Sequence, residues 1–146
     1  MGISAEDIAY SYLVRNNSLV QDLRQQKHGE FSGPSLVGTE GVIKLPDFIV
    51  YNKLERKGNF AVDVKAKTSV YPVNGKKCFT VDNKFEDYKR TVQIIKLDFL
   101  LLIFYYNGRM HFYKDSEFAC VTQFKNTTYG SGPVHCFEYS ESKVIF

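Results

Sequence analysis

Residues 46–66 have the sequence PDFIVYNKLERKGNFAVDVKA, and this stretch decides the fold. Two apolar runs, Leu45 to Tyr51 and Phe60 to Ala66, flank a polar segment, which predicts two strands joined by a turn. We expect the hairpin to close about Glu55, because a shift by one residue would turn every side chain to the other face of the sheet. In this register one face of the hairpin is apolar and suited to packing against a helix. Its side chains are those of Phe48, Val50, Phe60, Val62, Val64 and Ala66.

The opposite face of the hairpin gathers charged side chains. Asp47 lies directly across from Asp63, since both are eight residues from the tip, and Lys65 follows on the same face. Two carboxylates about 4 Å apart repel by roughly 4 kcal/mol at an effective dielectric of 20. A divalent cation removes this penalty, and oxygen ligands suit Mg²⁺ or Mn²⁺. Lys65 would then activate an attacking water and offset phosphate charge, so the three residues predict metal-assisted phosphodiester hydrolysis.

Outside the hairpin, apolar residues at helical spacing predict three helical stretches. The first begins after Ser4, which can cap it, with Asp7 at the capping-box position. The second runs from Ser18 to Gln26, and the third, an amphipathic helix, from Lys84 to Lys96.

Leu97 to Tyr106 is almost entirely apolar, which is typical of a central strand buried on both faces. Asn107-Gly108 suits a type I′ turn, which would return the chain as a strand from Arg109 to Tyr113. The order of these elements predicts a mixed α/β fold built around one sheet, in a single domain spanning residues 1–146.

The remaining segments are expected to be loops and short strands. His28 to Gly41 predicts a loop with a short strand, and Thr68 to Lys77 a loop containing the turn Asn74-Gly75. Short strands are expected at His135 to Tyr139 and at Lys143 to Phe146.

The charged hairpin resembles the signature of a known family. Pro46-Asp47, followed after fifteen intervening residues by Asp63-Val64-Lys65, resembles the PD-(D/E)XK motif of restriction-type nucleases. The layout of residues 4–113 is similar to that of archaeal Holliday junction resolvases and related phage or restriction endonucleases. The resemblance implies a restriction endonuclease-like mixed central sheet flanked by helices. It also implies a Mg²⁺-dependent endonuclease that cuts DNA, structure-selectively as junction resolvases do, with Mn²⁺ as an alternative metal.

The resemblance assigns roles to further residues. An acid on the first helix completes the metal site in such enzymes, which here points to Glu6, with Asp7 and Glu40 as rivals. A Ser or Thr soon after the lysine assists, which here is Thr68 or Ser69. Basic residues around the hairpin fit contacts to the phosphates of the substrate. The substrate-binding set is Lys67, Thr68, Ser69, Lys76 and Lys77.

Composition adds weaker indications. The net charge of +3 hints at an anionic partner. The chain has three widely spaced cysteines and no CxxC pair, which predicts free thiols in a reducing cytosol. No signal peptide or membrane-length apolar run is apparent, so we expect a cytoplasmic protein without membrane contact.

Two questions stay open in the sequence. A nucleic-acid-binding or protein-interaction module without cleavage, or an RNA-processing nuclease, would be compatible with the same fold. Junction-cutting enzymes need two symmetric sites, so we expect a homodimer. We expect aromatic residues of the second half to supply its interface, namely Phe104, Tyr105, Tyr106, Phe112 and Tyr113.

Overall fold

A computed structural model describes residues 4–17, 19–24, 35–39, 41–52, 58–82, 84–127 and 130–146. Its elements are α1 (Ala5–Asn16), β1 (Leu19–Asp22), β2 (Ser35–Gly38), β3 (Gly41–Lys44), β4 (Phe48–Tyr51), β5 (Phe60–Ala66), β6 (Tyr71–Val73), β7 (Lys76–Val81), α2 (Lys84–Ile94), β8 (Phe99–Tyr106), β9 (Arg109–Lys114), the 3₁₀ turn η1 (Asp115–Glu117), β10 (Cys120–Thr127), β11 (Gly130–Glu138) and the 3₁₀ turn η2 (Glu141–Lys143).

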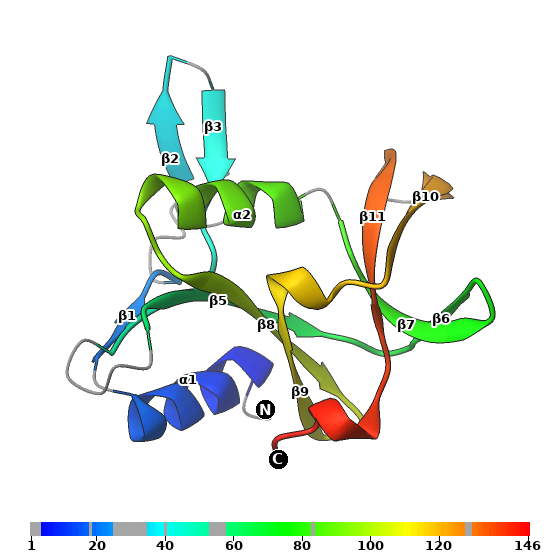
Figure 1. Ribbon diagram of the computed structural model, residues 1–146, viewed down its shortest axis with the longest axis horizontal. Helices are drawn as coiled ribbons and strands as arrows, with labels where there is room; N and C mark the ends of the chain where they lie inside the picture. Colours follow the sequence, from blue (N-terminus) through cyan, green and yellow to red (C-terminus); the bar gives the residue numbers. More distant parts are fainter. Residues whose placement is uncertain are drawn as a thin grey trace.

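The central sheet has five strands in the order β1-β4-β5-β8-β9. The pair β5–β8 is parallel and the other neighbours are antiparallel, so the sheet is mixed. Helix α1 lies against one face of this sheet and α2 on the other side (Figure 1). The predicted fold class, a mixed central sheet flanked by helices, is therefore confirmed.

The β4–β5 hairpin has the register predicted from the sequence. Phe48 pairs with Val62 and Val50 with Phe60, and continuing this register places Asp47 across from Asp63. The apolar face of the hairpin packs against α1 as expected. The shared core contains Ala9, Leu13, Phe48, Val50, Phe60, Val62, Val64, Ile103 and Met110.

Helix α1 begins as the sequence predicts. The Ser4 hydroxyl accepts a hydrogen bond from the backbone N–H of Asp7 at 3.1 Å, which satisfies one of the unpaired donors of the first turn. Ala9 and Leu13 on the next turns are fully buried against the sheet. The cap and this apolar stripe together fix where α1 starts and which side it presents to β4 and β5.

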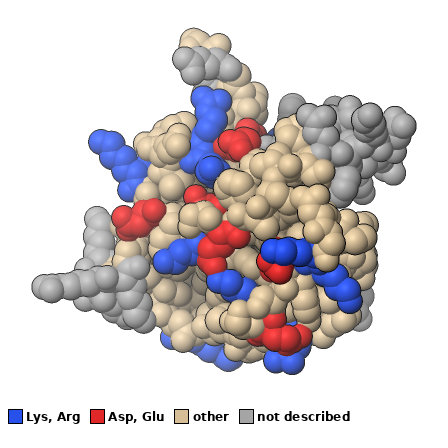
Figure 2. Space-filling view, turned by 45° about the vertical axis from the view of Figure 1, so that its right-hand side comes forward, with Lys and Arg blue, Asp and Glu red and all other residues tan. Residues whose placement is uncertain are grey.

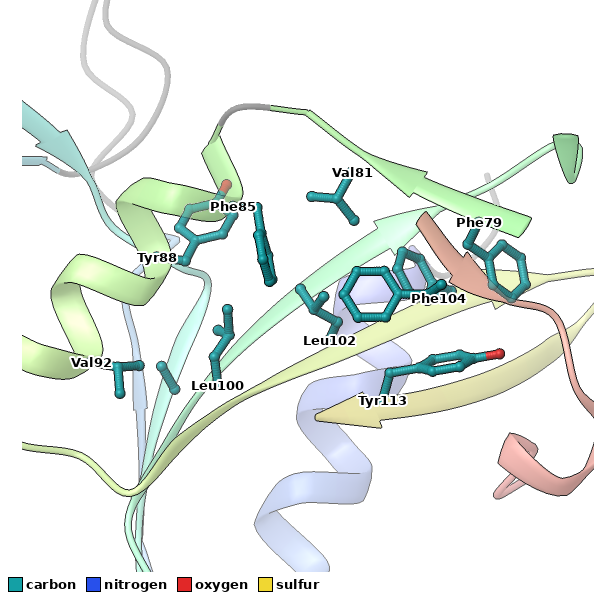
Figure 3. Close-up of a cluster of buried hydrophobic side chains, with 11 residues drawn as sticks. Phe79, Val81, Phe85, Tyr88, Val92, Leu100, Leu102, Phe104 and Tyr113 are labelled. Atoms are coloured by element: carbon teal, nitrogen blue, oxygen red, sulfur yellow. The ribbon is translucent and has the colours of Figure 1, made fainter. Parts of the chain in front are cut away.

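A second core fills the space between the central sheet and α2. Leu100, Leu102 and Phe104 line up along β8 and face side chains of α2 and β7 (Figure 3). Phe79 of β7 stacks on Phe104 with ring centroids 4.7 Å apart, and Tyr88 of α2 is 5% exposed. This packing places α2 over the charged face of β5.

The chain between β5 and α2 forms a β-hairpin, so the prediction of a loop from Thr68 to Lys77 is wrong. β6 and β7 pair around Asn74 and Gly75, whose φ angles of 51° and 80° suit the turn that joins twisted strands. Pro72 is tolerated because β6 is the edge strand of a second sheet, ordered β10-β11-β7-β6. The Asn74-Gly75 turn was predicted from the sequence, but the two strands that flank it were not.

The prediction of a helix from Ser18 to Gln26 is also wrong. The described part of this segment forms β1, in which Leu19 pairs with Tyr51 and Asp22 with Phe48. Pairing with the exposed edge of β4 overrides the local helical pattern, because it satisfies backbone groups of both strands.

The C-terminal segment differs in detail from the prediction. His135 to Glu138 lies within β11, as expected, but Lys143 ends the 3₁₀ turn η2 and Val144 forms only an isolated bridge to His111. Backbone hydrogen bonds also join this segment to β9, since Ile145 donates to the Met110 carbonyl at 3.0 Å and Met110 donates to that of Phe146 at 2.8 Å. The side chain of Phe146 stacks on Tyr12 of α1 with ring centroids 4.8 Å apart. Strand β10 was not anticipated.

Two of the five aromatic residues expected at a dimer interface, Phe104 and Tyr113, are buried in the core, which corrects the prediction for these two. Phe104 and Tyr113 are at most 2% exposed, while Tyr105, Tyr106 and Phe112 are partly buried against the same clusters. Within the described residues, no helix is long and apolar enough to cross a membrane.

Candidate active site

The two acids predicted to form the site belong to the β4–β5 hairpin, one within β5 and one directly before β4. Asp63 sits in the middle of β5 and is 3% exposed. Asp47 immediately precedes β4 and is partly buried. Its Oδ2 atom accepts a hydrogen bond from the backbone N–H of Val64 at 2.8 Å, which holds the carboxylate beside Asp63. The hairpin register therefore brings both carboxylates to one place.

Lys65 is the basic member of the same group. Its Nζ lies 3.1 Å from Oδ2 of Asp63, and it also lies 5.5 Å from the ring centroid of Tyr88. Burial alone would lower the pKa of Lys65, but the nearby Asp63 carboxylate outweighs this effect and raises it above the usual range. Lys65 is therefore a cation held at the buried acids.

The acids carry raised pKa values. Burial, and then the charge of Asp63, raise the pKa of Asp47 to about 7. Burial likewise raises the pKa of Asp63, although Lys65 opposes the shift. In the protein alone one lysine does not balance two buried carboxylates, so near neutral pH the pair tends to retain a proton.

One oxygen of the pair has spare ligand capacity. Oδ2 of Asp63 is buried and makes no hydrogen bond of acceptable geometry, despite its ion pair with Lys65. Two adjacent carboxylates, one of them with a buried oxygen that accepts no hydrogen bond, form a donor set that suits a hard divalent cation. However, the described residues contain no group of three or more His, Cys, Asp or Glu side chains placed to hold a metal.

The three rivals for a third acid are placed differently. Glu6 lies on the first turn of α1, and its charge helps to raise the pKa of Asp63. Asp7 instead contacts Arg24 at 2.9 Å, and this hydrogen bond lowers the pKa of Asp7. Glu40 lies outside the described residues. Glu6 is thus the acid of α1 that interacts electrostatically with the pair.

Arg24 organises the surroundings of Glu6. Its guanidinium lies 2.8 Å from Asp22, 2.9 Å from Asp7 and 3.9 Å from Glu6. It also lies 4.8 Å from the ring centroid of Phe48, next to Asp47 in the chain. This cluster anchors the start of α1 at the end of β4 that carries the site.

Of the predicted substrate-binding residues, Lys67 interacts electrostatically with Asp63. Its Nζ donates to the Thr80 carbonyl at 2.5 Å, and burial, then the charge of Lys65, lower its pKa. Thr68 is exposed and Ser69 partly buried, directly after β5. The two remaining lysines of the set lie at the start of β7, next to the β6–β7 turn. These are Lys76, 3.5 Å from Glu138, and the exposed Lys77.

Two residues near the site were missed in the sequence. Asp82 follows β7, and its charge favours the protonated form of both Lys65 and Lys67, opposing the lowering of the Lys67 pKa. Tyr88 projects from α2, and burial, then the charge of Asp63, raise its pKa well above the usual range. Tyr88 belongs to a helical stripe that resembles ordinary core, so no local signal distinguished it.

Charged side chains on the visible surface are intermixed. Figure 2 shows acidic and basic side chains next to one another across the middle of this face, rather than one continuous basic patch. This face therefore presents intermixed charges, consistent with the small net charge of +3.

Comparison with known proteins supports the fold. The structure is similar to that of Hjc, a Holliday junction resolvase from the archaeal hyperthermophile Archaeoglobus fulgidus, with a TM-score of 0.56. The similarity covers 94% of this chain and 87% of that chain at 10% sequence identity. No protein-family model matches the sequence, and neither does any curated protein. The similarity is thus one of fold.

Proposed function

We propose that residues 1–146 form a single metal-dependent endonuclease domain of the PD-(D/E)XK superfamily, which hydrolyses phosphodiester bonds of DNA. The observation that carries this proposal is the partly buried Asp47 beside the buried Asp63, whose carboxylate lies 3.1 Å from Nζ of Lys65, on the hairpin of a resolvase-like fold. Fold similarity and charged residues are separate observations, and each alone would be weaker support.

A divalent cation, Mg²⁺ or Mn²⁺, fits the donor set at this hairpin. Asp47 and Asp63 would hold it, with Glu6 as the additional acid. The cation would supply Lewis-acid polarisation of the phosphate and an activated water. Asp63 has the oxygen with spare ligand capacity, and charge from a cation would lower the raised pKa of both acids. The site is thus arranged so that a cation replaces a proton.

The chain's own residues would perform the remaining tasks. Lys65, kept positive by Asp63, is placed to orient the attacking water and to stabilise the charge that develops on the phosphate. Tyr88 limits where the ammonium group can move. Lys67, Thr68 and Ser69, which continue from the same strand, are the proposed contacts to the phosphates next to the cut.

A structure-selective activity on branched DNA is the finer proposal, because the similar solved structure is a Holliday junction resolvase. RNA as substrate is the alternative within the same chemistry. A binding module without cleavage is a second candidate, favoured by one observation: Asp63 is 3% exposed beneath α2. Cleavage would require that α2 or its side chains move, so that the substrate can reach Asp63.

A two-fold dimer belongs to the resolvase-like proposal, because opposed strands of a junction require two active sites related by symmetry. Its interface cannot use Phe104 and Tyr113, which are buried within the chain. Exposed apolar side chains include Val37 and Val42, which face each other across the β2–β3 hairpin and are 78% and 57% exposed. Figure 1 shows this hairpin projecting from the body of the protein.

The proposal is tested by digestion of a substrate panel with Mg²⁺ or with EDTA. The panel contains supercoiled plasmid, linear duplex, a four-way junction, single strands and RNA. We expect cleavage of DNA in Mg²⁺ and none in EDTA, with the junction cut fastest. Faster cleavage of RNA would assign the alternative substrate. Binding of DNA without cleavage of any substrate would favour the non-cutting module.

A further inference from the structure

The second sheet brings together all three cysteines of the chain, which lie far apart in the sequence. Cys78 is on β7, Cys120 at the start of β10 and Cys136 on β11. Together with Val73 they form a small cluster separate from the two main cores. The cluster therefore gathers three reduced thiols that no sequence motif had linked.

Strand register defines how the thiols face each other. Cys120 and Cys136 are direct partners across β10 and β11, so their side chains project from the same face. Cys136 is the direct partner of Thr80 on the other side, which places Cys78 on the same face but in a diagonal position. Direct partners have Cβ atoms about 4.5–5.5 Å apart and diagonal neighbours about 7–8 Å, so Cys120–Cys136 is the pair nearest to disulfide geometry.

The three thiols differ in access and in surroundings. Cys78 and Cys136 are at most 1% exposed, and each donates a weak hydrogen bond to a carbonyl of its own strand. Cys120 is partly exposed, and its sulfur accepts a weak hydrogen bond from Nδ2 of Asn74 at 4.0 Å. An oxidant from solvent would therefore meet Cys120 first.

We propose that Cys120 and Cys136 form a redox-active dithiol that a hydroperoxide oxidises to a cross-strand disulfide. This inference does not depend on the proposed nuclease function. The Cys120 thiolate attacks one oxygen of hydrogen peroxide, which gives a sulfenic acid and, with one proton, water. The Cys136 sulfur then attacks the Cys120 sulfur, and its proton leaves with the hydroxyl group as a second water. Each sulfur loses one electron, and the peroxide is reduced by two.

The order of attack follows from the environment of the two sulfurs. Burial, and then contact with the Cys120 thiol, raise the pKa of Cys136 to about 12, so Cys136 is a poor first nucleophile. It acts as the resolving thiol because it is already next to Cys120. The resulting cross-link would close a loop of fifteen intervening residues and restrict the unfolded chain.

The test treats the folded full-length protein with a small excess of hydrogen peroxide. We expect free thiols to fall from three to one, with a peptide map that links Cys120 to Cys136 and reversal by dithiothreitol. Cys78→Ser should form the same link, whereas Cys120→Ser and Cys136→Ser should form no intramolecular disulfide. The oxidised wild type should unfold at higher urea concentration than the reduced protein.

Two results would overturn the proposal. One is a wild-type peptide map in which Cys78 is linked in place of Cys120 or Cys136. The other is retention of all three thiols by the folded protein under conditions that oxidise a urea-unfolded sample. Both are read from the wild type, so the proposal stays testable if a cysteine variant fails to fold.

Discussion

The backbone N–H of Val64 donates a hydrogen bond of 2.8 Å to the carboxylate of Asp47. Val64 stands between Asp63 and Lys65, so this bond holds Asp47 against the rest of the charged group. The contact persists although burial and the charge of Asp63 raise the pKa of Asp47 to about 7. The fold therefore keeps two acids close at the expense of stability, an arrangement more typical of functional sites than of structural ones.

The first prediction is that Asp47→Asn stabilises the metal-free protein above pH 7. The folded-state pKa of Asp47 lies above its usual value of 3.8, so the folded state binds more protons and stability falls as pH rises from about 4 to about 7. Asparagine removes the charge and can still accept the Val64 hydrogen bond. Urea denaturation in EDTA should show a gain on the order of 1–3 kcal/mol at pH 8 and little change at pH 4.

Glu141→Gln is the matched control for this comparison. Glu141 is an exposed acid on η2, and its side chain accepts a hydrogen bond from Tyr139 that glutamine can also accept. This variant should match wild type at both pH values. An Asp47→Asn protein that is no more stable than wild type at pH 8 would show that the acids do not repel each other as described.

The second prediction concerns Lys65. Its ammonium group lies beside Asp63, and on the proposed mechanism it stabilises charge that develops in the transition state. Lys65→Ala should therefore lower the cleavage rate by about 10²–10³-fold while DNA binding, measured by gel shift in Ca²⁺, changes little. Arg15→Ala, which removes an exposed cation from the last turn of α1, serves as the control. Equal losses of binding and cleavage would make Lys65 a phosphate-binding residue.

The third prediction distinguishes two neighbouring acids of α1. Both acids pair with Arg24, Asp7 at 2.9 Å and Glu6 at 3.9 Å, but the charge of Glu6 also acts on Asp63. Glu6→Gln should raise the Mg²⁺ concentration needed for half-maximal cleavage by about tenfold, the usual order for an outer ligand or its support. Asp7→Asn should leave this concentration nearly unchanged. A reversed ranking in the Mg²⁺ titration would transfer the role to Asp7.

The fourth prediction concerns assembly. A resolvase-like enzyme with symmetric sites should be a dimer, with a mass about twice the 16.8 kDa of the chain by light scattering at micromolar concentration. Replacing exposed Val37 by Asp tests whether the β2–β3 hairpin contributes, with Val14→Asp on α1 as an equally apolar, exposed control. A monomer at all concentrations, with and without DNA, would exclude the resolvase-like arrangement and leave the metal site untouched.

The sequence predicted the charged hairpin well, because alternation along two strands admits a single register that keeps the apolar residues together. The observed pairing of Phe48 with Val62 is the one expected from closure about Glu55. The Ser4 cap and the Asn107-Gly108 turn were equally local signals, and both are present, with φ angles of 51° and 75° at the turn. Local chemistry is sufficient where the interacting groups are close in the chain.

Features that depend on distant contacts were missed. Leu19 to Asp22 became a strand because the edge of β4 was available, which no local pattern shows. The ion pairs of Arg24 with Glu6 and Asp7 form only when α1 packs on the sheet. In the same way, Tyr88 reaches Lys65 only when α2 packs on the sheet. Likewise Cys120 and Cys136 face each other through the pairing of two strands, one of which was not expected.

The most direct test of the central claim is nicking of supercoiled plasmid by wild type, Asp47→Asn and Asp63→Asn, each with Mg²⁺ and with EDTA. Circular dichroism verifies that the variants are folded. We predict that wild type nicks only with Mg²⁺ and that each variant, lacking one carboxylate of the pair, loses at least about 10²-fold of the rate. Full activity in either folded variant, or wild-type nicking that persists in EDTA, would contradict the account.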